Sequence, residues 1–193
     1  MPGIGERRLI LVGGGARSGK SRFALQRALA LGPRRAFIAT AEPLDDEMAR
    51  RIQHHRVERG GAFSTVEEPI ALAEAVEAAA ANADVVVVDC LTLWVSNLLV
   101  KGIGPVEIAD RFGQLEAVLD GLPTPVVLVT NEVGMGLVPE TPLGRQFRDV
   151  IGNLHQRLAA RADELYAALM GVVLRLQPGP VTIVPATSLE ELP

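Results

Sequence analysis

A phosphate-binding loop is the most specific chemical feature of this chain of 193 residues. Its residues follow the pattern G-x-x-x-x-G-K-S and are Gly14, Gly15, Ala16, Arg17, Ser18, Gly19, Lys20 and Ser21. Glycines let such a loop turn tightly and aim backbone N–H groups at phosphate oxygens, while the lysine reaches the β- and γ-phosphates. The serine hydroxyl is a ligand for Mg²⁺. The pattern therefore predicts binding of a nucleoside triphosphate, and a chance glycine-rich turn is the weaker alternative.

A carboxylate suited to the same metal ion follows a later apolar run. Asp89 closes the segment 85–88, which consists of four valines. An acidic residue at the end of an apolar strand is the usual magnesium-side carboxylate of P-loop enzymes. We expect Ser21 and Asp89 to hold Mg²⁺, although a strand-end aspartate can also simply cap the next helix.

Two adjacent histidines could supply a nucleophile. His54 and His55 lie in the stretch 45–59, which has acidic residues at its start and helical character. Helical phase places His54 on the face that carries arginines and His55 on the side of Ile52. Neutral imidazole can attack an α-phosphorus, release pyrophosphate and hold the nucleotidyl group. A solvated surface imidazole is the alternative for His54. A metal site is disfavoured because His155 is distant in sequence.

The elements that must position these residues follow from periodicity. Apolar runs alternate with segments of helical period, which indicates a mainly parallel α/β sheet flanked by helices. We expect strands at 9–12, 36–39, 85–89 and 126–130, and a weaker one at 63–66. We expect helices at 21–31, 45–59, 70–81, 93–100, 106–119 and 143–162. Apolar runs on both sides of Gly171 favour a C-terminal antiparallel hairpin.

Ligands of open α/β sheets bind beyond the carboxyl ends of the strands, so the residues just past each strand matter most. Asn131 and Glu132 follow the strand expected at 126–130. They either lie near the γ-phosphate or the phosphate acceptor, or serve a sharp loop in which Glu132 forms an ion pair. Three arginines at positions 145, 148 and 157 could contact substrate phosphate or another subunit. For each of them we favour the solvated face of a helix.

Bulk properties narrow the classes of function. The length predicts one domain over residues 1–177, with an extended or disordered tail at 178–193. A net charge of −4 argues against a nucleic-acid partner. Cys90 is the single cysteine, which excludes an intrachain disulfide and favours a buried thiol. No apolar run is long enough to cross a membrane or to act as a signal peptide, so we expect a cytoplasmic protein.

In order along the chain, these motifs resemble the bifunctional adenosylcobinamide kinase/adenosylcobinamide-phosphate guanylyltransferase family of cobalamin biosynthesis. The resemblance covers about residues 8–176. It is specific because few P-loop proteins also carry the paired-histidine helix and an Asn-Glu-Val-Gly-x-Gly run, which here begins at Asn131.

The resemblance implies two reactions. A nucleoside triphosphate, ATP or GTP, phosphorylates adenosylcobinamide, and GTP then guanylylates a histidine that passes GMP to adenosylcobinamide phosphate. The guanylylated residue maps to His54. Further nucleotide contacts map to Ala39, Thr40, Ala41, His55, Arg56, Glu67 and Asp89. The family has a RecA-like fold and forms a homotrimer. The alternatives are a P-loop small-molecule kinase without nucleotidyl transfer and a RecA-like oligomeric ATPase.

Overall fold

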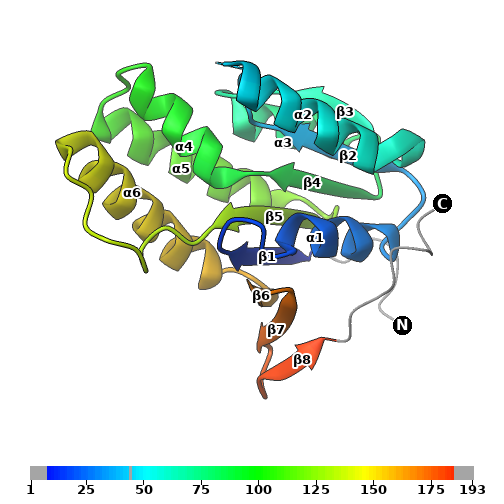
Figure 1. Cartoon of the computed structure of the whole chain (residues 1–193). Coiled ribbons are helices and arrows are strands. Elements are labelled where there is room, and N and C mark those ends of the chain that lie inside the picture. The colour runs from blue at the N-terminus through cyan, green and yellow to red at the C-terminus, as the bar shows by residue number, and fades with distance from the viewer. Residues whose placement is uncertain (1–7, 44, 185–193) are drawn as a thin grey trace.

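The computed structural model describes residues 8–43 and 45–184, although the side chains at positions 51, 54, 55, 58 and 59 lie outside that description. Within these residues one sheet contains the strands β1 (Leu9–Gly14), β2 (Arg35–Ala39), β3 (Ser64–Glu67), β4 (Val85–Asp89), β5 (Val126–Asn131), β6 (Glu164–Leu169), β7 (Val172–Gln177) and β8 (Thr182–Val184). The helices are α1 (Lys20–Leu29), α2 (Asp46–Arg59), α3 (Leu72–Ala80), α4 (Leu91–Val100), α5 (Pro105–Gly121) and α6 (Pro142–Ala159), with a 3₁₀ turn at Gly60–Ala62. Figure 1 shows their arrangement.

The sheet has the order β3-β2-β4-β5-β1-β6-β7-β8. The strands from β3 to β6 in this order are parallel, and β7 and β8 extend the sheet in antiparallel fashion. The predicted fold class, a mainly parallel sheet flanked by helices with a C-terminal hairpin, is confirmed. β8 lies in the segment 178–193 that we expected to be extended or disordered, and its three residues pair with β7. Residues 185–193 of that segment lie outside the described part.

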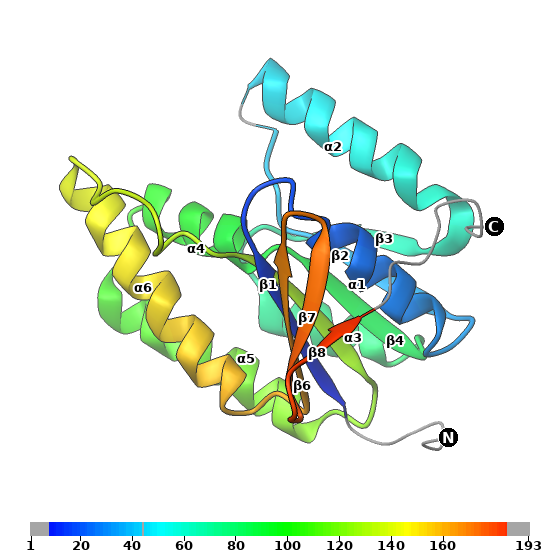
Figure 2. The same cartoon turned by 60° about the horizontal axis from the view of Figure 1, so that its bottom comes forward.

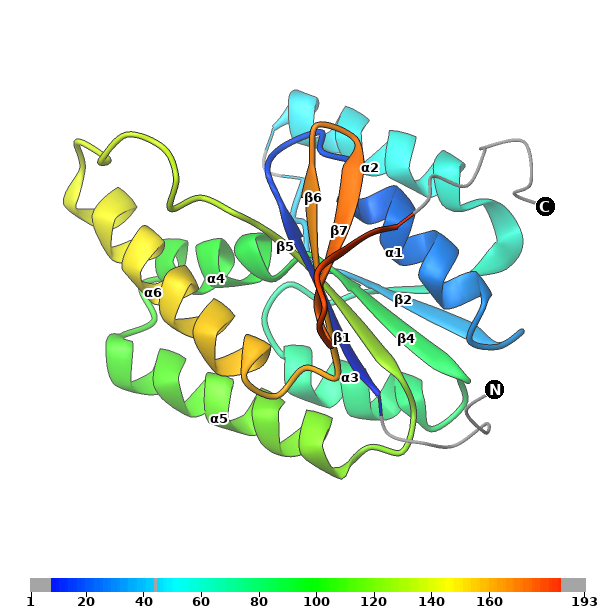
Figure 3. The same cartoon turned by 90° about the horizontal axis from the view of Figure 1, so that it is seen from below.

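The central strands β1, β4 and β5 are apolar runs because both of their faces are buried. Alternate side chains of β1 enter two separate cores. Leu9 and Leu11 pack with α3, α4, α5 and α6, whereas Ile10 and Val12 pack with α1. Figure 3 shows these helices on the two faces of the sheet. Buried valines in register hold β4 against β5, so the carboxyl ends of β1, β4 and β5 meet at one edge.

Helix α2 differs from the other helices because it packs little against the sheet, and Figure 2 shows it standing apart from the strands. Asp45 caps its amino end, with the carboxylate accepting a hydrogen bond of 2.7 Å from the Met48 N–H. The helix ends at Gly60, whose φ of 53° favours glycine. Met48 and Ile52 are half-buried, as the helical phase predicted, while the other described side chains of α2 are exposed.

The turn between β6 and β7 touches the phosphate-binding loop. Met170 and Gly171 both have positive φ, 51° and 83°, which matches the two-residue turn preferred by right-twisted hairpins. The Gly171 N–H donates a 3.2 Å hydrogen bond to the Ser18 carbonyl. The hairpin therefore supports the loop through its backbone.

A buried carboxylate joins α1 to β6 at the opposite end of the sheet. Glu164 is 4% exposed and forms ion pairs with Arg8 and Arg27, and it also accepts a hydrogen bond from the Tyr166 hydroxyl. Burial alone would raise the pKa of Glu164. Hydrogen bonds from Arg27 and Tyr166 and the charges of Arg27 and Arg8 outweigh burial, so its pKa lies below the usual value.

We expect Glu164→Gln to destabilise the fold by about 3 kcal/mol near neutral pH, because it leaves partly buried arginines without their counter-charge. A depressed pKa in the folded state stabilises the protein above the ordinary glutamate pKa of about 4.3. That stabilisation is lost as the pH falls through the lower folded pKa. Urea unfolding between pH 3 and 7 would check this. The difference between wild type and variant should shrink on the acid side, and a constant difference would contradict the assignment.

An ion pair to a buried carboxylate corrects an expectation about Arg157. We expected a solvated helix face, but its guanidinium donates two hydrogen bonds of 2.7 Å to Glu116, which is 6% exposed. The same guanidinium lies 5.7 Å from the centre of the Phe112 ring. The pair clamps α6 to α5, and sequence could not show it because the partners are 41 positions apart.

Candidate active site

The phosphate-binding loop runs from the end of β1 to the start of α1, as predicted. Gly14 cannot carry a side chain there, since an added Cβ would lie 2.4 Å from the Ala168 carbonyl oxygen. Gly19 caps α1 with a φ of 94°, a conformation that favours glycine. The first N–H groups of a helix have no partner within the helix, and with the helix dipole they form an anion site. The loop is therefore built to receive phosphate at the amino end of α1.

The Lys20 side chain curls back over this loop. Its Nζ donates a 3.1 Å hydrogen bond to the Gly15 carbonyl, and the residue is only 8% exposed. The Ser18 side chain is also buried, and its hydroxyl lacks a hydrogen-bond partner among the described residues. The Gly15 carbonyl is an uncharged acceptor, so moving the Lys20 ammonium from it to a phosphate oxygen breaks no ion pair at that carbonyl.

Asp89 closes β4 at the same edge of the sheet, two strands from β1. The buried thiol of Cys90 follows it directly. Burial and the charge of Asp89 together raise the pKa of this thiol to about 11, although a hydrogen bond from Thr92 and the charge of Lys20 partly oppose them. Cys90 is therefore a buried, protonated thiol, as expected. The serine hydroxyl of Ser21 and the carboxylate of Asp89 are hard oxygen ligands that suit Mg²⁺.

Thr40 is the fully buried link between β2 and β4. Its hydroxyl donates to the Cys90 carbonyl at 2.7 Å and accepts from the Cys90 N–H at 2.9 Å. Asn97 donates to the Thr40 carbonyl at 2.7 Å. The hydroxyl of this predicted nucleotide contact is thus engaged in holding the strand ends together. Ala39 and Ala41 flank it and are half-buried.

Asn131 is the last residue of β5 and Glu132 follows it, on the strand next to that of Asp89. The Asn131 amide donates to Thr92 Oγ1 at 2.7 Å, which ties β5 to the start of α4. The backbone N–H of Glu132 donates to the Gly14 carbonyl at 3.0 Å, and its carboxylate accepts from the Gly134 N–H. Glu132 therefore both orders its own loop and lies directly beside the phosphate-binding loop.

The structure adds residues that sequence reasoning missed. His155 of α6 lies with one ring nitrogen, Nε2, 2.7 Å from Thr130 Oγ1 and the other, Nδ1, 3.9 Å from a Glu132 oxygen. Burial lowers the pKa of His155, and the nearby Glu132 only partly offsets it. Local spacing carries no signal of this group, because α6 must fold back over the end of β5 to form it. Thr92 and Asn97 were missed for the same reason.

The structure describes the side chains of only some of the predicted site residues on and beside α2. Arg56 of α2 pairs with Glu67 of β3, so the structure brings these two predicted contacts together. His54 and His55 belong to α2, but their side chains lie outside the described part of the structure.

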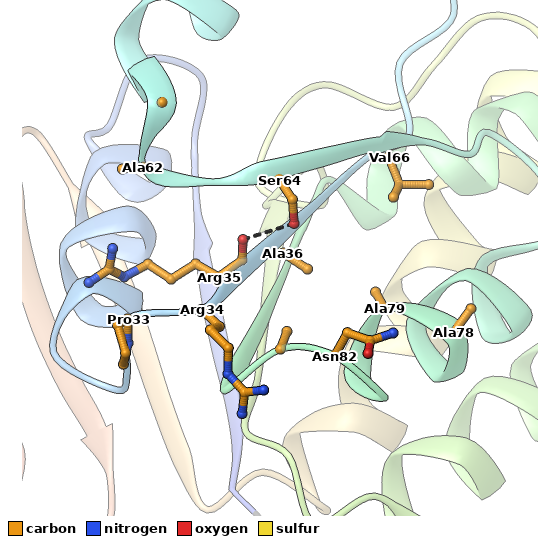
Figure 4. A pocket seen from close by; sticks show the side chains of 12 residues that line it. Pro33, Arg34, Arg35, Ala36, Ala62, Ser64, Val66, Ala78, Ala79 and Asn82 are labelled. Carbon is orange, nitrogen blue, oxygen red and sulfur yellow. Dashed lines mark hydrogen bonds between the residues drawn. The ribbon is translucent and has the colours of Figure 1, made fainter.

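No predicted site residue lines the surface hollow at the opposite edge of the sheet. This hollow lies beside the amino ends of β2 and β3 and the carboxyl end of α3, and Figure 4 shows it. Its lining includes Arg34, Ser64 and Ala79. Of the helices in the described ranges, none is long and apolar enough to cross a membrane. Those ranges also contain no cluster of three or more histidine, cysteine or acidic residues that could hold a metal ion.

Comparison with known proteins connects this site to a family. The model of the cobinamide kinase / cobinamide phosphate guanyltransferase family matches residues 10–176. The bifunctional adenosylcobalamin biosynthesis protein CobU of Salmonella typhimurium is 42% identical over 181 residues, covering 88% of this chain and 99% of that protein. The bifunctional adenosylcobalamin biosynthesis protein CobP of Pseudomonas aeruginosa is 41% identical over 171 residues, with coverages of 89% and 98%.

A solved structure supports the fold alone. The flagellar accessory protein FlaH of Methanocaldococcus jannaschii aligns with a TM-score of 0.54 at 14% identity, covering 95% of this chain and 92% of that one. The family match, in contrast, spans the phosphate-binding loop, α2, Asp89 and the loop after β5. This chain therefore belongs to the cobinamide kinase / cobinamide phosphate guanyltransferase family.

Proposed function

We propose that this protein phosphorylates adenosylcobinamide with ATP or GTP and then transfers GMP from GTP to adenosylcobinamide phosphate, giving adenosyl-GDP-cobinamide. The observation that carries the proposal is the family match over residues 10–176 together with a phosphate-binding loop of the required geometry. A kinase without nucleotidyl transfer and a RecA-like ATPase are not favoured by this match. The adenosylcobalamin biosynthesis named for the relatives is then the pathway of this chain too.

The guanylyl transfer is proposed to pass through His54. An imidazole nitrogen attacks the α-phosphorus of GTP, the bond from that phosphorus to the bridging oxygen breaks, and pyrophosphate leaves with the electron pair. A phosphate oxygen of the acceptor then attacks the same phosphorus and releases the imidazole. A covalent intermediate of this kind splits one difficult transfer into two easier ones. Helical phase in the sequence, which predicts His54 on the side of the arginines, supports this role.

The nucleotide is proposed to bind through residues 14–21, with Ala39, Thr40, Ala41, His55, Arg56, Glu67 and Asp89 around it. Thr40 would act by fixing the strand ends, since its side chain is buried. Ser21 and Asp89 would hold Mg²⁺, which neutralises phosphate charge when bound. Lys20 would exchange its contact with Gly15 for a phosphate oxygen.

We also propose a homotrimer in the cytoplasm. Exposed apolar side chains on the hairpin and β8 support association, since a second subunit could cover them; they include Leu169, Met170, Val172 and Ile183. A free cysteine and nucleoside triphosphate substrates fit a reducing cytoplasm.

Incubation of the protein with α-³²P-labelled GTP and Mg²⁺ tests the proposal. Phosphoramidates are labile in acid and stable in alkali, so label with this behaviour on the protein supports the histidine intermediate. Nucleotide binding without any label would leave a plain kinase and contradict the guanylyltransferase role.

The labelling should also depend on pH. Attack on phosphorus requires neutral imidazole, whose ordinary pKa is about 6.5. The initial labelling rate should therefore fall below about pH 6, by roughly tenfold for each further pH unit. Rates measured between pH 5 and 8 would check this, and an undiminished rate at pH 5 would contradict a histidine of ordinary pKa.

A further inference from the structure

The kinase reaction needs a group that accepts a proton, and the guanylyl transfer does not. In the kinase step the attacking group is an alcohol, and its proton must leave as the oxygen bonds to phosphorus. The imidazole of His54 and the phosphate of the second acceptor attack through lone pairs that carry no proton. A general base is therefore required for phosphorylation alone, and the proposed function above does not name one.

Among the described residues, few carboxylates at the edge where the parallel strands end could serve as this general base. Asp89 is assigned to the metal ion, and Glu67 is paired with Arg56. Glu42 is paired with Lys101, and Glu68 accepts the N–H groups of Ile70 and Ala71. Glu132 has no lysine or arginine partner within the described ranges. It is also the one that donates its backbone N–H to Gly14, at the start of the phosphate-binding loop.

The two oxygens of Glu132 have different surroundings. Oε1 accepts the N–H of Gly134 and so fixes the side chain to its own loop. Oε2 faces His155 Nδ1 at 3.9 Å, which is too long for a hydrogen bond. The side chain is 37% exposed, so an acceptor hydroxyl can approach it from solvent. Oε1 is therefore held by the Gly134 N–H, and Oε2 is left to accept a proton from the hydroxyl.

His155 is placed to hold the available oxygen in position. Its side chain is 18% exposed, and its Nε2 is bonded to Thr130, which is 2% exposed. Its pKa is lowered, mainly by burial, so the ring is neutral at physiological pH. When the Thr130 hydroxyl donates to Nε2, the single ring N–H lies on Nδ1 and points at the carboxylate. This tautomer accepts the Thr130 hydroxyl at Nε2 and leaves an N–H on the side of Glu132, where a small shift would bring it into hydrogen-bond distance.

We infer that Glu132 is the general base of the phosphorylation step and that His155, oriented by Thr130, is its positioning residue. The acceptor oxygen bonds to the γ-phosphorus while the bond to the β,γ-bridging oxygen breaks, and the nucleoside diphosphate leaves with that electron pair. The hydroxyl proton passes to Glu132 Oε2 and then to solvent. The inference rests on the proposed kinase activity.

Glu132→Gln tests the base directly, because glutamine keeps an oxygen for the Gly134 N–H but is not basic. We expect kcat for phosphorylation of adenosylcobinamide, measured with γ-³²P-labelled ATP and GTP, to fall by roughly 10²–10⁴-fold. KM should change little, and GTP should still label the enzyme. The matched control is Glu140→Gln, an exposed glutamate of the same loop, which should retain wild-type rates.

A Glu132→Gln enzyme whose phosphorylation kcat stays within threefold of wild type would overturn the inference, as would an equal loss of phosphorylation and guanylylation. Wild type lacking both reactions would instead refute the proposed function. His155→Ala and Thr130→Val should lower kcat for phosphorylation without raising KM, and His155→Asn should restore part of it. Losses that appear only as raised KM would contradict a positioning role.

Discussion

Replacing His54 by alanine should abolish covalent labelling of the protein by α-³²P-labelled GTP, while GTP binding to the phosphate-binding loop persists. The alanine side chain has no lone pair with which to attack the α-phosphorus, so the proposed phosphoramidate cannot form at this position. The transfer of GMP to adenosylcobinamide phosphate should be lost with the label. Phosphorylation of adenosylcobinamide should continue, because the proposed route for that step does not use His54.

His55→Ala is the matched control for this experiment. Helical phase turns adjacent side chains about 100° apart, so we expect only one of the two imidazoles to be aligned for attack on the α-phosphorus. We expect the His55 variant to retain covalent label, with GTP affinity reduced if His55 contacts the nucleotide. Label that vanishes in His55→Ala and persists in His54→Ala would identify His55 as the guanylylated residue and contradict the proposal for His54. Label in both variants would place it elsewhere.

The second large effect is expected from Lys20→Met, which should reduce both phosphorylation and guanylylation. Both reactions develop negative charge on phosphate oxygens, and the buried Lys20 is the residue of this loop that reaches the β- and γ-phosphates in P-loop proteins. Removing one preorganised donor of this kind costs roughly 10²–10³ in kcat. Methionine matches the length of the lysine side chain and the apolar character of its stem. Within the described residues the change removes the hydrogen bond from Lys20 to the Gly15 carbonyl, so the fold should be retained.

Steady-state kinetics of both reactions, with thermal unfolding of each variant, would check this expectation. The chain has only one other lysine, Lys101, which forms a surface ion pair with Glu42. Lys101→Met should therefore leave both rates near wild type. A Lys20→Met enzyme that loses only one reaction would show that the two triphosphates bind at different sites.

The sequence predicted the central part of the fold well for a local reason. Strands buried on both faces must be apolar along their whole length, and β1, β4 and β5 display this directly. The edge strand β3 was only a weak prediction, since all four of its residues are exposed. Strand β8 was not predicted as a strand. Its three residues pair only with β7 at the end of the sheet, where burial imposes little pattern.

In the candidate site too, the sequence predicted the residues of local motifs and missed the contacts between distant elements. The phosphate-binding loop, Asp89 and the paired histidines are contiguous motifs, so their chemistry is legible from residue type and spacing. Arg157 was assigned to a solvated face because helical periodicity cannot reveal that α5 offers a buried Glu116. His155 was set aside as too distant from the other histidines, yet α6 brings it onto Thr130.

By itself, then, the sequence determined the class of chemistry, because phosphate binding depends on a short loop whose glycines, lysine and serine must be neighbours. It also determined which strands form the core, because burial on both faces leaves an apolar run. The tertiary structure alone decided which polar groups meet across elements. Glu132 gains its anchor at Gly14 and its neighbour His155 only when β5 pairs with β1 and α6 packs over the sheet, and those contacts join residues up to 118 positions apart (132 − 14).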